Sequence, residues 1–386
     1  MRRKKSLINI KDYLKGLRNV EQFICSSCGR KHEITPTLWK CECGGVLDIA
    51  KEIPKIDVAT WNAYPNSLWR YVETMPFKKD SRTWEGVTMG EGQSPLIVLD
   101  SENPNSYVKV DYMMPTLSFK DRGAAVLMTL AKELGVKKVI ADSSGNAGTA
   151  IAAYAARSNI ACDIYLRDTT SPKKIDQVKA HGATIKAVHG TREDIAAAAQ
   201  WAVDEEGVFY ASHVYNPYFY EGTKTYAYEI YEQLNNVPDS VIVPVGNGTL
   251  LLGVYYGFKE LFENALIEKM PKIIAIQAKH CAPLAEAYRN GEKTAQPVVN
   301  EGTLAEGIAI AAPARSRQIL EAVRNTNGTF IEIEEDEILD ARAELSGKGF
   351  YVEVTSAVNY AGYLKYEKRP EEKIIIPLCG AGIKSK

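Results

Sequence analysis

Apolar and polar positions along the chain form a repeating pattern that begins near Tyr107. Short apolar runs typical of strands alternate with longer segments whose apolar residues recur at helical spacing. The strand-like runs span 107–113, 137–144, 161–167 and 183–188, and the helical segments span 118–135, 146–158, 171–182 and 192–207. Later runs at 240–246, 272–278, 330–333 and 373–380 are mostly apolar on both faces. Such strands between helices indicate parallel sheets that are covered on both sides.

The length of the chain predicts more than one hydrophobic core. The sequence has 386 residues, and single cores stop growing at about 250–300 residues. We therefore expect an α/β fold of two doubly wound parallel-sheet domains. The large domain would combine 51–135 with 214–386, the small α/β domain would span 136–213, and 1–50 would form a separate appendage. Residues 51–95 are rich in Trp, Tyr and Pro, and we expect an irregular arm there.

Composition and charge argue against several classes of partner. The apolar fraction is 45% and the charged fraction is 25%, both ordinary for a soluble globular protein. With 47 basic and 48 acidic residues, the net charge is −1, which is not the electrostatic footprint of a nucleic-acid-binding protein. The basic start "MRRKK" is followed by no apolar run long enough for a signal peptide or a membrane span. We expect a cytoplasmic protein with neither a nucleic acid nor a membrane as partner.

Four of the seven cysteines are clustered near the N-terminus. Cys25 and Cys28 are spaced C-x2-C, and Cys41 and Cys43 follow as C-x-C after twelve intervening residues. Two short cysteine turns followed by glycines are typical of a four-cysteine zinc ribbon. The alternatives are four ordinary thiols or a redox pair. A zinc ion with four protein ligands would be structural and would say little about the chemistry of the protein.

A lysine lies where a helix is expected to begin, in the stretch "TLSFKDRG" at 116–123. Ser118 can cap that helix, which places Lys120 in the first turn. The positive end of the helix dipole disfavours an ammonium ion and lowers the pKa of the amine. A lysine with a lowered pKa is suited to forming a Schiff base. The alternative is an ordinary surface lysine that extends into solvent.

Two more strand-to-helix turns carry candidate chemistry. In "DSSGNAG" at 142–148, small residues expose backbone N–H groups to an anion such as a carboxylate. In "VPVGNGTLLLG" at 243–253, a buried strand runs through two glycines into an apolar helix, which suits a phosphate. Each turn alone is equally typical of an ordinary capped helix. Because ligands bind beyond the carboxyl ends of parallel strands, an amine, a carboxylate site and a phosphate site there together describe a site for pyridoxal phosphate and an amino acid.

The same stretches resemble threonine synthase and its relatives, the fold type II (tryptophan synthase β-like) pyridoxal-phosphate enzymes. The resemblance is carried by "SFKDRG", "SSGNAGTAIAAYAA", "NPYFYEGTKT", "VPVGNGTLLLG" and "LCGAGIK". It extends from the cysteine cluster to the C-terminus, and many threonine synthases begin with a four-cysteine ribbon. The resemblance implies that the cofactor lies in the cleft between the two domains. It also implies a small amino-acid substrate and a homodimer, which is usual for the superfamily.

The resemblance implies a role for each residue that matches a family motif. Lys120 would form the internal aldimine with the cofactor and would later move the α-proton. The remaining cofactor contacts would come from Phe119, Asn146, Gly246, Asn247, Gly248, Thr249, Leu250 and Cys379. Ser143, Ser144 and Ala147 would hold the substrate carboxylate.

One stretch departs from the family pattern. Threonine synthases usually read N-S-x-N-P-x-R-x-x-G-x-K-T where this chain reads "HVYNPYFYEGTKT". This alignment puts His213, Val214 and Phe219 at the Asn, Ser and Arg positions, and the family uses that Ser and Arg to grip the phosphate of O-phosphohomoserine. Valine and phenylalanine side chains have no hydrogen-bond donors, so that grip would be lost. His213 would then line a more polar and aromatic substrate pocket, or serve only in packing.

Other residues could change or restore the specificity. Lys224, Arg315 and Arg317 are candidate cations that could compensate for the lost arginine. Glu306, followed by glycine, is more typical of serine and threonine dehydratases than of threonine synthases.

The residue beside the pyridine nitrogen also differs from the usual one. Cys379 lies where the family usually places a neutral Ser or Thr, and a thiol with a reference pKa of about 8.5 is a poor partner for a protonated pyridine. The alternative for Cys379 is a small buried hydrophobic residue.

Three functional hypotheses follow from these residues. The first is threonine synthase activity with a substrate phosphate gripped by unfamiliar residues. The second is elimination from, or β-replacement on, serine, threonine, diaminopropionate or phosphoserine, as in dehydratases or cysteate synthase. The third is a non-enzymatic scaffold in which the cysteine ribbon binds a partner and the pocket is vestigial. The intact Lys120 and both anion-binding turns favour an enzyme, a pyridoxal-phosphate-dependent lyase.

Overall fold

The structure is a computed structural model that describes residues 22–78, 80–170 and 172–384. The predicted lead-in at 1–21 lies outside these residues. The described chain divides into two compact units. Unit 1 combines residues up to Pro54 with Val72–Met89 and Lys120–Gly222, and unit 2 combines Lys55–Tyr71, Gly90–Phe119 and Thr223 onward. The domain bounds expected from the sequence remain a prediction.

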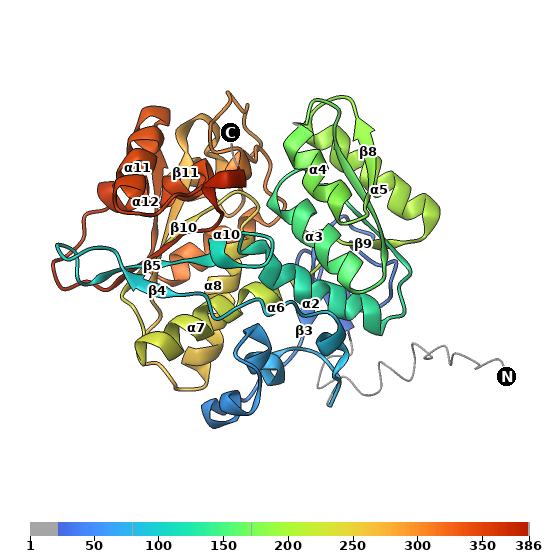
Figure 1. Cartoon of the computed structure of the whole chain (residues 1–386), viewed down its shortest axis with the longest axis horizontal. Helices are drawn as coiled ribbons and strands as arrows, with labels where there is room; N and C mark the ends of the chain where they lie inside the picture. The colour runs from blue at the N-terminus through green and yellow to red at the C-terminus, as the bar shows by residue number, and fades with distance from the viewer. Residues whose placement is uncertain (1–21, 79, 171, 385–386) are drawn as a thin grey trace. The chain divides into compact units, whose positions relative to one another are not determined.

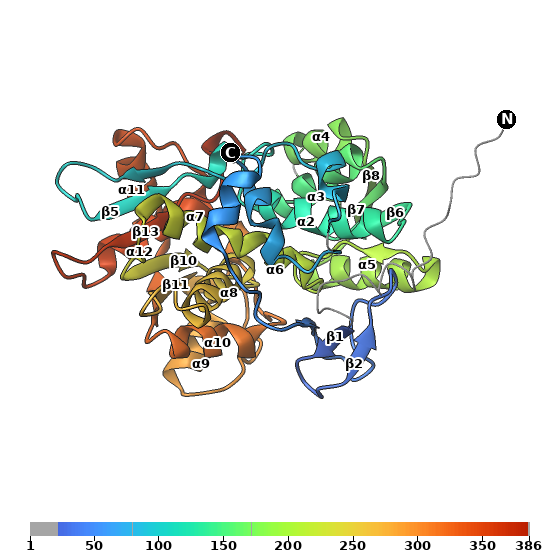
Figure 2. The same cartoon turned by 90° about the horizontal axis from the view of Figure 1, so that it is seen from below.

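Unit 1 contains a four-stranded sheet in which all neighbouring strands are parallel. In spatial order the strands are β8 (Thr184–Val188), β7 (Ala161–Arg167), β6 (Lys138–Ala141) and β9 (Phe209–Tyr210). The helices of this unit are α2 (Lys120–Glu133), α3 (Asn146–Arg157), α4 (Pro172–Ala180), α5 (Arg192–Glu206) and α6 (Tyr218–Thr223, which ends at the junction with unit 2). Helix α5 lies on the face of the sheet opposite α3 and α4 (Figure 2). Helices on both faces explain why the central strands β6 and β7 are mostly buried, whereas the edge strand β8 is not.

The ends of α5 show how local sequence sets the helix boundaries. Thr191 and Asp194 form a reciprocal capping box at the start of the helix. Gly207 ends the helix in the left-handed conformation with a φ of 59°, which glycine adopts at little cost. These caps fix Arg192 as the first helical residue, at the carboxyl end of β8.

The N-terminal appendage is a three-stranded antiparallel sheet within unit 1. Its strands are β1 (Gln22–Cys25), β2 (Lys31–Glu33) and β3 (Leu47–Ala50), in the order β2-β1-β3. The loop from β2 to β3 returns beside Cys25 at Gly45, where a Cβ atom would lie 2.6 Å from the Cys25 sulfur. Only glycine fits this close approach.

Unit 2 contains a six-stranded sheet in the order β12-β11-β10-β13-β5-β4. All neighbours are parallel except β4, which pairs antiparallel with β5 at one edge. In chain order the strands are β4 (Leu96–Val98), β5 (Ser106–Lys109), β10 (Ser240–Pro244), β11 (Lys272–Ala278), β12 (Thr329–Ile333) and β13 (Ile374–Pro377). The central strands β10 and β13 are completely buried.

Helices cover both faces of this second sheet. They are α7 (Thr225–Leu234), α8 (Thr249–Glu263), α9 (Pro283–Arg289), α10 (Ser316–Asn325), α11 (Glu335–Gly347) and α12 (Val354–Lys365). Helix α12 packs against the central strands on one face, while α8 and α10 cover the other (Figures 1 and 2). An apolar core lies between the sheet and α11 and α12.

Most of the sequence-based expectations for the fold are confirmed. Each strand and helix predicted between 107 and 207 is present, with ends that shift by a few residues. The α/β fold with parallel sheets is confirmed, with the added finding of the antiparallel edge strand β4. Between 51 and 95 the described residues contain three 3-10 helices (Val58–Ala63, Leu68–Thr74 and Thr83–Gly86) and no α-helix, as the expected irregular arm requires.

One local expectation is wrong. Ser118 does not cap α2, because its buried hydroxyl makes no hydrogen bond to the described part of the chain. Instead the Ser118 backbone forms an antiparallel bridge to Gly380. None of the helices in the described ranges has both the length and the apolar character needed to cross a bilayer.

The contact between α7 and α8 leads to a stability prediction. A Cβ atom on Gly257 in α8 would lie 2.4 Å from the Lys224 carbonyl oxygen and 2.6 Å from the Ala227 Cβ, whereas one on Gly347 in α11 would meet nothing within 4 Å. We expect Gly257→Ala to lower the free energy of unfolding by about 1–3 kcal/mol through overpacking. Gly347→Ala should be neutral or stabilising by up to about 1 kcal/mol. Urea unfolding followed by circular dichroism measures both, and equal effects of the two substitutions would contradict the described packing.

Candidate active site

Lys120 is the first residue of α2 and is partly exposed. Its amine lies 6.0 Å from the centroid of the Phe219 ring, and that ring is fully buried. Gly123, one turn further along α2, makes room for the ring, because a Cβ atom there would lie 2.2 Å from it. The two neighbours of Lys120 in the same turn, Asp121 and Arg122, are completely buried. In the first turn of α2, Lys120 is therefore the cation that a small molecule can reach.

The turn between β6 and α3 contains the predicted carboxylate-binding residues. Helix α3 begins at Asn146, so the backbone N–H groups that follow have no acceptor within the helix. Gly145 donates its N–H to the Ser143 hydroxyl over 3.3 Å. The turn is so tight that a Cβ atom on Gly148 would lie 1.8 Å from the Ser143 carbonyl oxygen. This arrangement is suited to binding an anion at a helix N-terminus.

Asp142, the residue before this turn, is buried and held by two partners. It accepts a hydrogen bond from Arg192 Nη2 over 2.7 Å and one from the Tyr210 hydroxyl over 2.8 Å. Burial lowers the pKa of the Arg192 guanidinium, but the charge of Asp142 and its hydrogen bond outweigh burial and raise it overall. Burial and the same carboxylate raise the pKa of Tyr210 well above its usual value. The turn is thus fixed by a carboxylate that remains paired.

His213 also belongs to this part of unit 1. Its ring lies 6.0 Å from the Phe219 ring, edge to face. Burial lowers the pKa of His213 well below its usual value, and the positive charges of Lys120 and Arg192 lower it further. His213 is therefore a neutral imidazole near Lys120, able both to donate and to accept a hydrogen bond. The predicted site residues Lys120, His213 and Phe219 thus lie together.

The segment that bears His213 and Phe219 packs against the N-terminal appendage. The Trp39 indole donates a hydrogen bond to Asp204 over 2.8 Å, and its ring contacts Tyr210 and Tyr215 edge to face at 5.2 and 5.1 Å. Lys51, just after β3, forms an ion pair with Glu221 over 2.6 Å. The appendage therefore supports the wall of the candidate substrate pocket.

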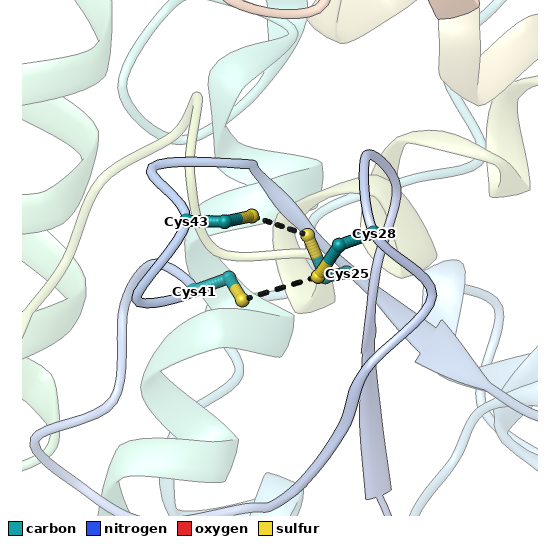
Figure 3. A group of neighbouring side chains, drawn as sticks. All are labelled: Cys25, Cys28, Cys41 and Cys43. Carbon is teal, nitrogen blue, oxygen red and sulfur yellow. Dashed lines mark hydrogen bonds between the residues drawn. The ribbon is translucent and has the colours of Figure 1, made fainter.

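The four clustered cysteines converge as the sequence predicts. Figure 3 shows the sulfurs of Cys25, Cys28, Cys41 and Cys43 facing one another, and all four lie within 4.8 Å of one another. Backbone N–H groups of Cys28 and Ser27 are among the groups that offset burial and lower the pKa of Cys25 to about 6. Such a group of sulfurs with backbone donors fits a tetrahedral thiolate site for a metal such as zinc.

In unit 2, the turn between β10 and α8 has the form of a phosphate cradle. Gly248 adopts a left-handed conformation with a φ of 78°, and a Cβ atom there would collide with Ile319 at 2.5 Å. A Cβ atom on Gly246 would lie 2.8 Å from the Ile310 side chain. Thr249 and Leu250 open α8, so their N–H groups have no acceptor within the helix. Glycines and a helix N-terminus fit a bound phosphate.

Cys379 lies at the carboxyl end of β13 in unit 2 and is buried. Its carbonyl oxygen accepts a hydrogen bond from the Phe119 N–H over 2.9 Å. The Asn359 amide nitrogen lies 3.8 Å from the Cys379 sulfur, and its side-chain oxygen has no hydrogen-bond partner among the described residues. The Ser118 hydroxyl is likewise without one. Buried polar atoms without partners are rare in folded proteins, so this region fits a polar ligand such as the heterocycle of a cofactor.

The structure also places the other residues singled out in the sequence. Val214 is buried, and Glu306 is exposed in a 3-10 helix (Glu306–Ile308). Lys224 is held in a buried ion pair with Glu260 over 3.0 Å, so its charge is already compensated.

The two arginine candidates are at the start of α10. Arg315 is buried there and donates to Gln318 over 3.4 Å, while Arg317 is partly exposed in a loose pair with Glu321. Both belong to unit 2, whereas Lys120 belongs to unit 1.

Sequence reasoning missed three residues near the carboxylate-binding turn. They are Asp142, Arg192 and Tyr210. Arg192 is 50 positions from Asp142 along the chain, and Tyr210 is 68 positions from it, yet both form hydrogen bonds with its carboxylate. An aspartate directly after a predicted strand and an arginine at a predicted helix start were available as signals. Without the order of the strands, however, nothing in the sequence joins them.

Comparisons with known proteins agree with this geometry. The chain matches the family described as pyridoxal-phosphate dependent enzyme over residues 87–380. It is 34% identical to threonine synthase of Methanocaldococcus jannaschii over 376 residues, covering 93% of this chain and 92% of that protein. It is 33% identical to threonine synthase of Methanosarcina acetivorans over 352 residues, covering 88% of this chain and 85% of that protein.

Solved structures share the fold. The processed form of threonine deaminase isoform 2 from Solanum lycopersicum superposes with a TM-score of 0.66 at 25% identity, covering 84% of this chain and 85% of that one. Maize serine racemase superposes with the same TM-score at 22% identity, covering 75% of this chain and 88% of that one, and so supports the fold alone.

The fold and these matches define a fold type II pyridoxal-phosphate enzyme that acts on a small amino acid by elimination or replacement. Within this class, the chain belongs to the threonine synthase family of pyridoxal-phosphate-dependent lyases.

The lowered pKa of His213 leads to a pH-dependent prediction. The folded state keeps His213 neutral, whereas the unfolded chain takes up a proton below its usual pKa of 6.5. Unfolding is then favoured as the pH falls through that value, so His213 contributes stability above pH 6.5 that is lost below it. We expect His213→Gln to reduce the difference in unfolding free energy between about pH 5 and about pH 8. Urea titrations at both pH values test this, and an unchanged difference would mean that His213 protonates freely in the folded protein.

Proposed function

We propose that the protein converts an amino acid with a leaving group on its side chain by elimination and replacement, as threonine synthases convert O-phosphohomoserine to threonine. The observation that carries this proposal is the placement of Lys120 at the start of α2, in the same unit as the anion-binding turn at Ser143 and Ser144. Similarity to threonine synthases over 93% of the chain supports it.

The residues present fit pyridoxal phosphate, and we assign them as follows. Lys120 would hold the cofactor through its aldehyde carbon, and Gly246, Asn247, Gly248, Thr249 and Leu250 would hold the phosphate with backbone N–H groups. Phe119 and Asn146 would contact the ring and its phenolic oxygen. Cys379 would face the pyridine nitrogen, where the unpartnered Asn359 oxygen adds a second polar atom.

We assign substrate binding to residues of unit 1. Backbone N–H groups and hydroxyls at Ser143, Ser144 and Ala147 would hold the substrate carboxylate. His213, neutral beside Phe219, would offer a hydrogen bond to the substrate side chain.

The cofactor supplies an electron sink that stabilises negative charge at the substrate α-carbon. Lys120 would supply the complementary proton chemistry, removing the α-proton and returning a proton later. Cys379 would offer the pyridine nitrogen of the cofactor a thiol where other enzymes offer an acidic side chain. Without an acidic partner the cofactor withdraws electrons less strongly, which favours prompt loss of a leaving group over amino-group transfer.

A second candidate function is supported by the pocket wall. Val214 and Phe219 are both buried and offer no donors where threonine synthases have Ser and Arg. This favours a substrate such as serine, threonine, diaminopropionate or phosphoserine, with ammonia-lyase or β-replacement activity in the manner of dehydratases or cysteate synthase.

Several further features belong to the proposal. Zinc would occupy the four-cysteine site in a structural role. The large domain would combine 51–135 with 214–386, and the small domain would span 136–213. A cytoplasmic homodimer that binds neither nucleic acid nor membrane follows from what is usual for the family and from the balanced charge of the chain.

The assay that tests the function uses the purified protein with its cofactor. We expect O-phospho-L-homoserine to yield phosphate and threonine in equal amounts, because the family chemistry couples loss of phosphate to addition of water. Lys120→Ala should abolish both the visible cofactor absorbance and turnover, since no other amine in α2's first turn is accessible.

The outcomes separate the hypotheses. Turnover of serine, threonine, diaminopropionate or phosphoserine, with none of O-phospho-L-homoserine, would favour the second candidate. Full activity of Lys120→Ala would refute the cofactor assignment, and a wild-type protein that binds no pyridoxal phosphate would favour the scaffold.

The zinc proposal is tested by metal content. We expect one zinc per chain, lost in Cys41→Ser together with a lower unfolding temperature, because a thiolate ligand is replaced by a poor one. Cys162→Ser is the matched control, since Cys162 is buried in β7 away from the cluster. Zinc retained in Cys41→Ser, or absent from the wild type purified with zinc present, would refute the assignment.

A further inference from the structure

Arg192 is a second cation in the part of unit 1 that contains Lys120. Helix α5 begins at Arg192, and the capping box of Thr191 and Asp194 fixes its backbone there. Strands β8 and β6 are parallel to β7 between them, so their carboxyl ends lie at the same edge of the sheet. From the end of β8, the long side chain reaches Asp142 at the end of β6. It therefore extends along the edge where the carboxylate-binding turn lies.

The guanidinium of Arg192 is only partly used by the protein. Nη2 binds Asp142, whereas the buried Nη1 atom makes no hydrogen bond to any described residue. A buried donor without a partner is costly and calls for an explanation. The side chain as a whole is 36% exposed, so part of it borders solvent, although Nη1 itself lies on the buried side. A guanidinium group that is held by one nitrogen, and whose second nitrogen has no partner among the described residues, can donate a hydrogen bond to an anion.

Charged groups of both signs surround the Arg192 guanidinium, and the negative one is already paired. Asp142 is the negative group, and it is already engaged by Arg192 and by the Tyr210 hydroxyl. Lys120 and Arg192 both lie close enough to His213 for their charges to act on it, and His213 itself is neutral. His213 is thus within electrostatic range of two cations.

The position where threonine synthases have arginine cannot supply this recognition. Phe219 is completely buried, in contact with Gly123 and with the edge of His213. Among the cations suggested by the sequence, Lys224 is neutralised by Glu260 in a buried pair. Arg192 is the arginine of unit 1 whose charge reaches both His213 and the turn that begins at Ser143.

We infer that Arg192 recognises an anionic group on the side chain of the substrate, a phosphate or a similar oxyanion, and so replaces the arginine that Phe219 lacks. This inference rests on the proposed function and names its substrate class, an amino acid that carries a negative charge on its leaving group. Arg192 is a specificity-determining residue in this scheme, while Lys120 performs the chemistry.

The test measures binding of unreactive ligands to the protein with its cofactor bound. L-2-amino-5-phosphonopentanoate keeps the charge and length of a phosphorylated substrate but has no leaving group, and L-norvaline is its uncharged counterpart. Isothermal titration calorimetry should show tighter binding of the phosphonate to the wild type. Arg192→Gln should weaken phosphonate binding about 10- to 100-fold, as expected for loss of a charge-assisted hydrogen bond. Binding of L-norvaline should be unchanged, and Arg192→Lys should restore part of the phosphonate affinity.

Two further variants separate recognition from a merely structural role. Asp142→Asn disturbs the carboxylate-binding turn and breaks the same ion pair but keeps the guanidinium, so both ligands should weaken together while the preference for the phosphonate over L-norvaline is retained. Arg167→Gln, at an exposed arginine that ends β7, should bind both ligands like the wild type.

The remaining outcomes would overturn the inference. Equal losses for phosphonate and L-norvaline in Arg192→Gln would assign Arg192 to the α-carboxylate or to the fold. A wild type that binds L-norvaline as tightly as the phosphonate would refute anion recognition while leaving the proposed function intact. A cofactor-loaded protein that binds no amino acid at all would refute the proposed function and this inference with it.

Discussion

The buried carboxylate of Asp142 is the interaction on which the arrangement of unit 1 depends. It ties α5 through Arg192 and β9 through Tyr210 to the end of β6, where the anion-binding turn begins. A carboxylate with 5% of its side chain exposed must be paired to remain charged. Because both partners are supplied by elements that follow much later in the chain, the turn at Ser143 takes its final form only when the whole sheet is assembled.

The same interaction links the cysteine appendage to the candidate pocket. Tyr210 donates a hydrogen bond from its hydroxyl to Asp142, and its ring forms a T-shaped contact with Trp39. Phe23 in β1 contacts Tyr218 at the start of α6, and Lys51 pairs with Glu221 one turn later. The segment 210–221, which these contacts hold at both ends, contains His213 and Phe219. A structural metal in the appendage would therefore stiffen the wall of the candidate substrate pocket, although none of the four cysteines of the appendage is assigned a part in the chemistry.

The fold was predictable from the sequence where local patterns decide it. Strands such as Ala161–Arg167 are apolar runs between helix caps, and the structure places them at those residues. The strand-to-helix turns at Ser143 and at Gly246 were predictable for the same reason, whereas their binding of anions remains a prediction. Ser118 failed as a cap because a tertiary bridge to Gly380 took its backbone out of position. The antiparallel strand β4 and the pairing of Asp142 with Arg192 depend on strand order, which local patterns do not encode.

Packing explains why the anion-binding arginine that we propose is Arg192 and not a residue at position 219. An arginine at 219 would need space beside Gly123, where the phenyl ring now fills the gap within 2.2 Å of an added Cβ atom. The apolar ring lowers the polarity around Lys120 and His213, and burial is the largest cause of the lowered pKa of His213. A neutral imidazole adds no charge to the pocket, so an incoming anion must find its compensation elsewhere. The guanidinium at the far strand end, anchored by Asp142 and with one nitrogen unused, is the group in unit 1 with the charge and the reach to provide it.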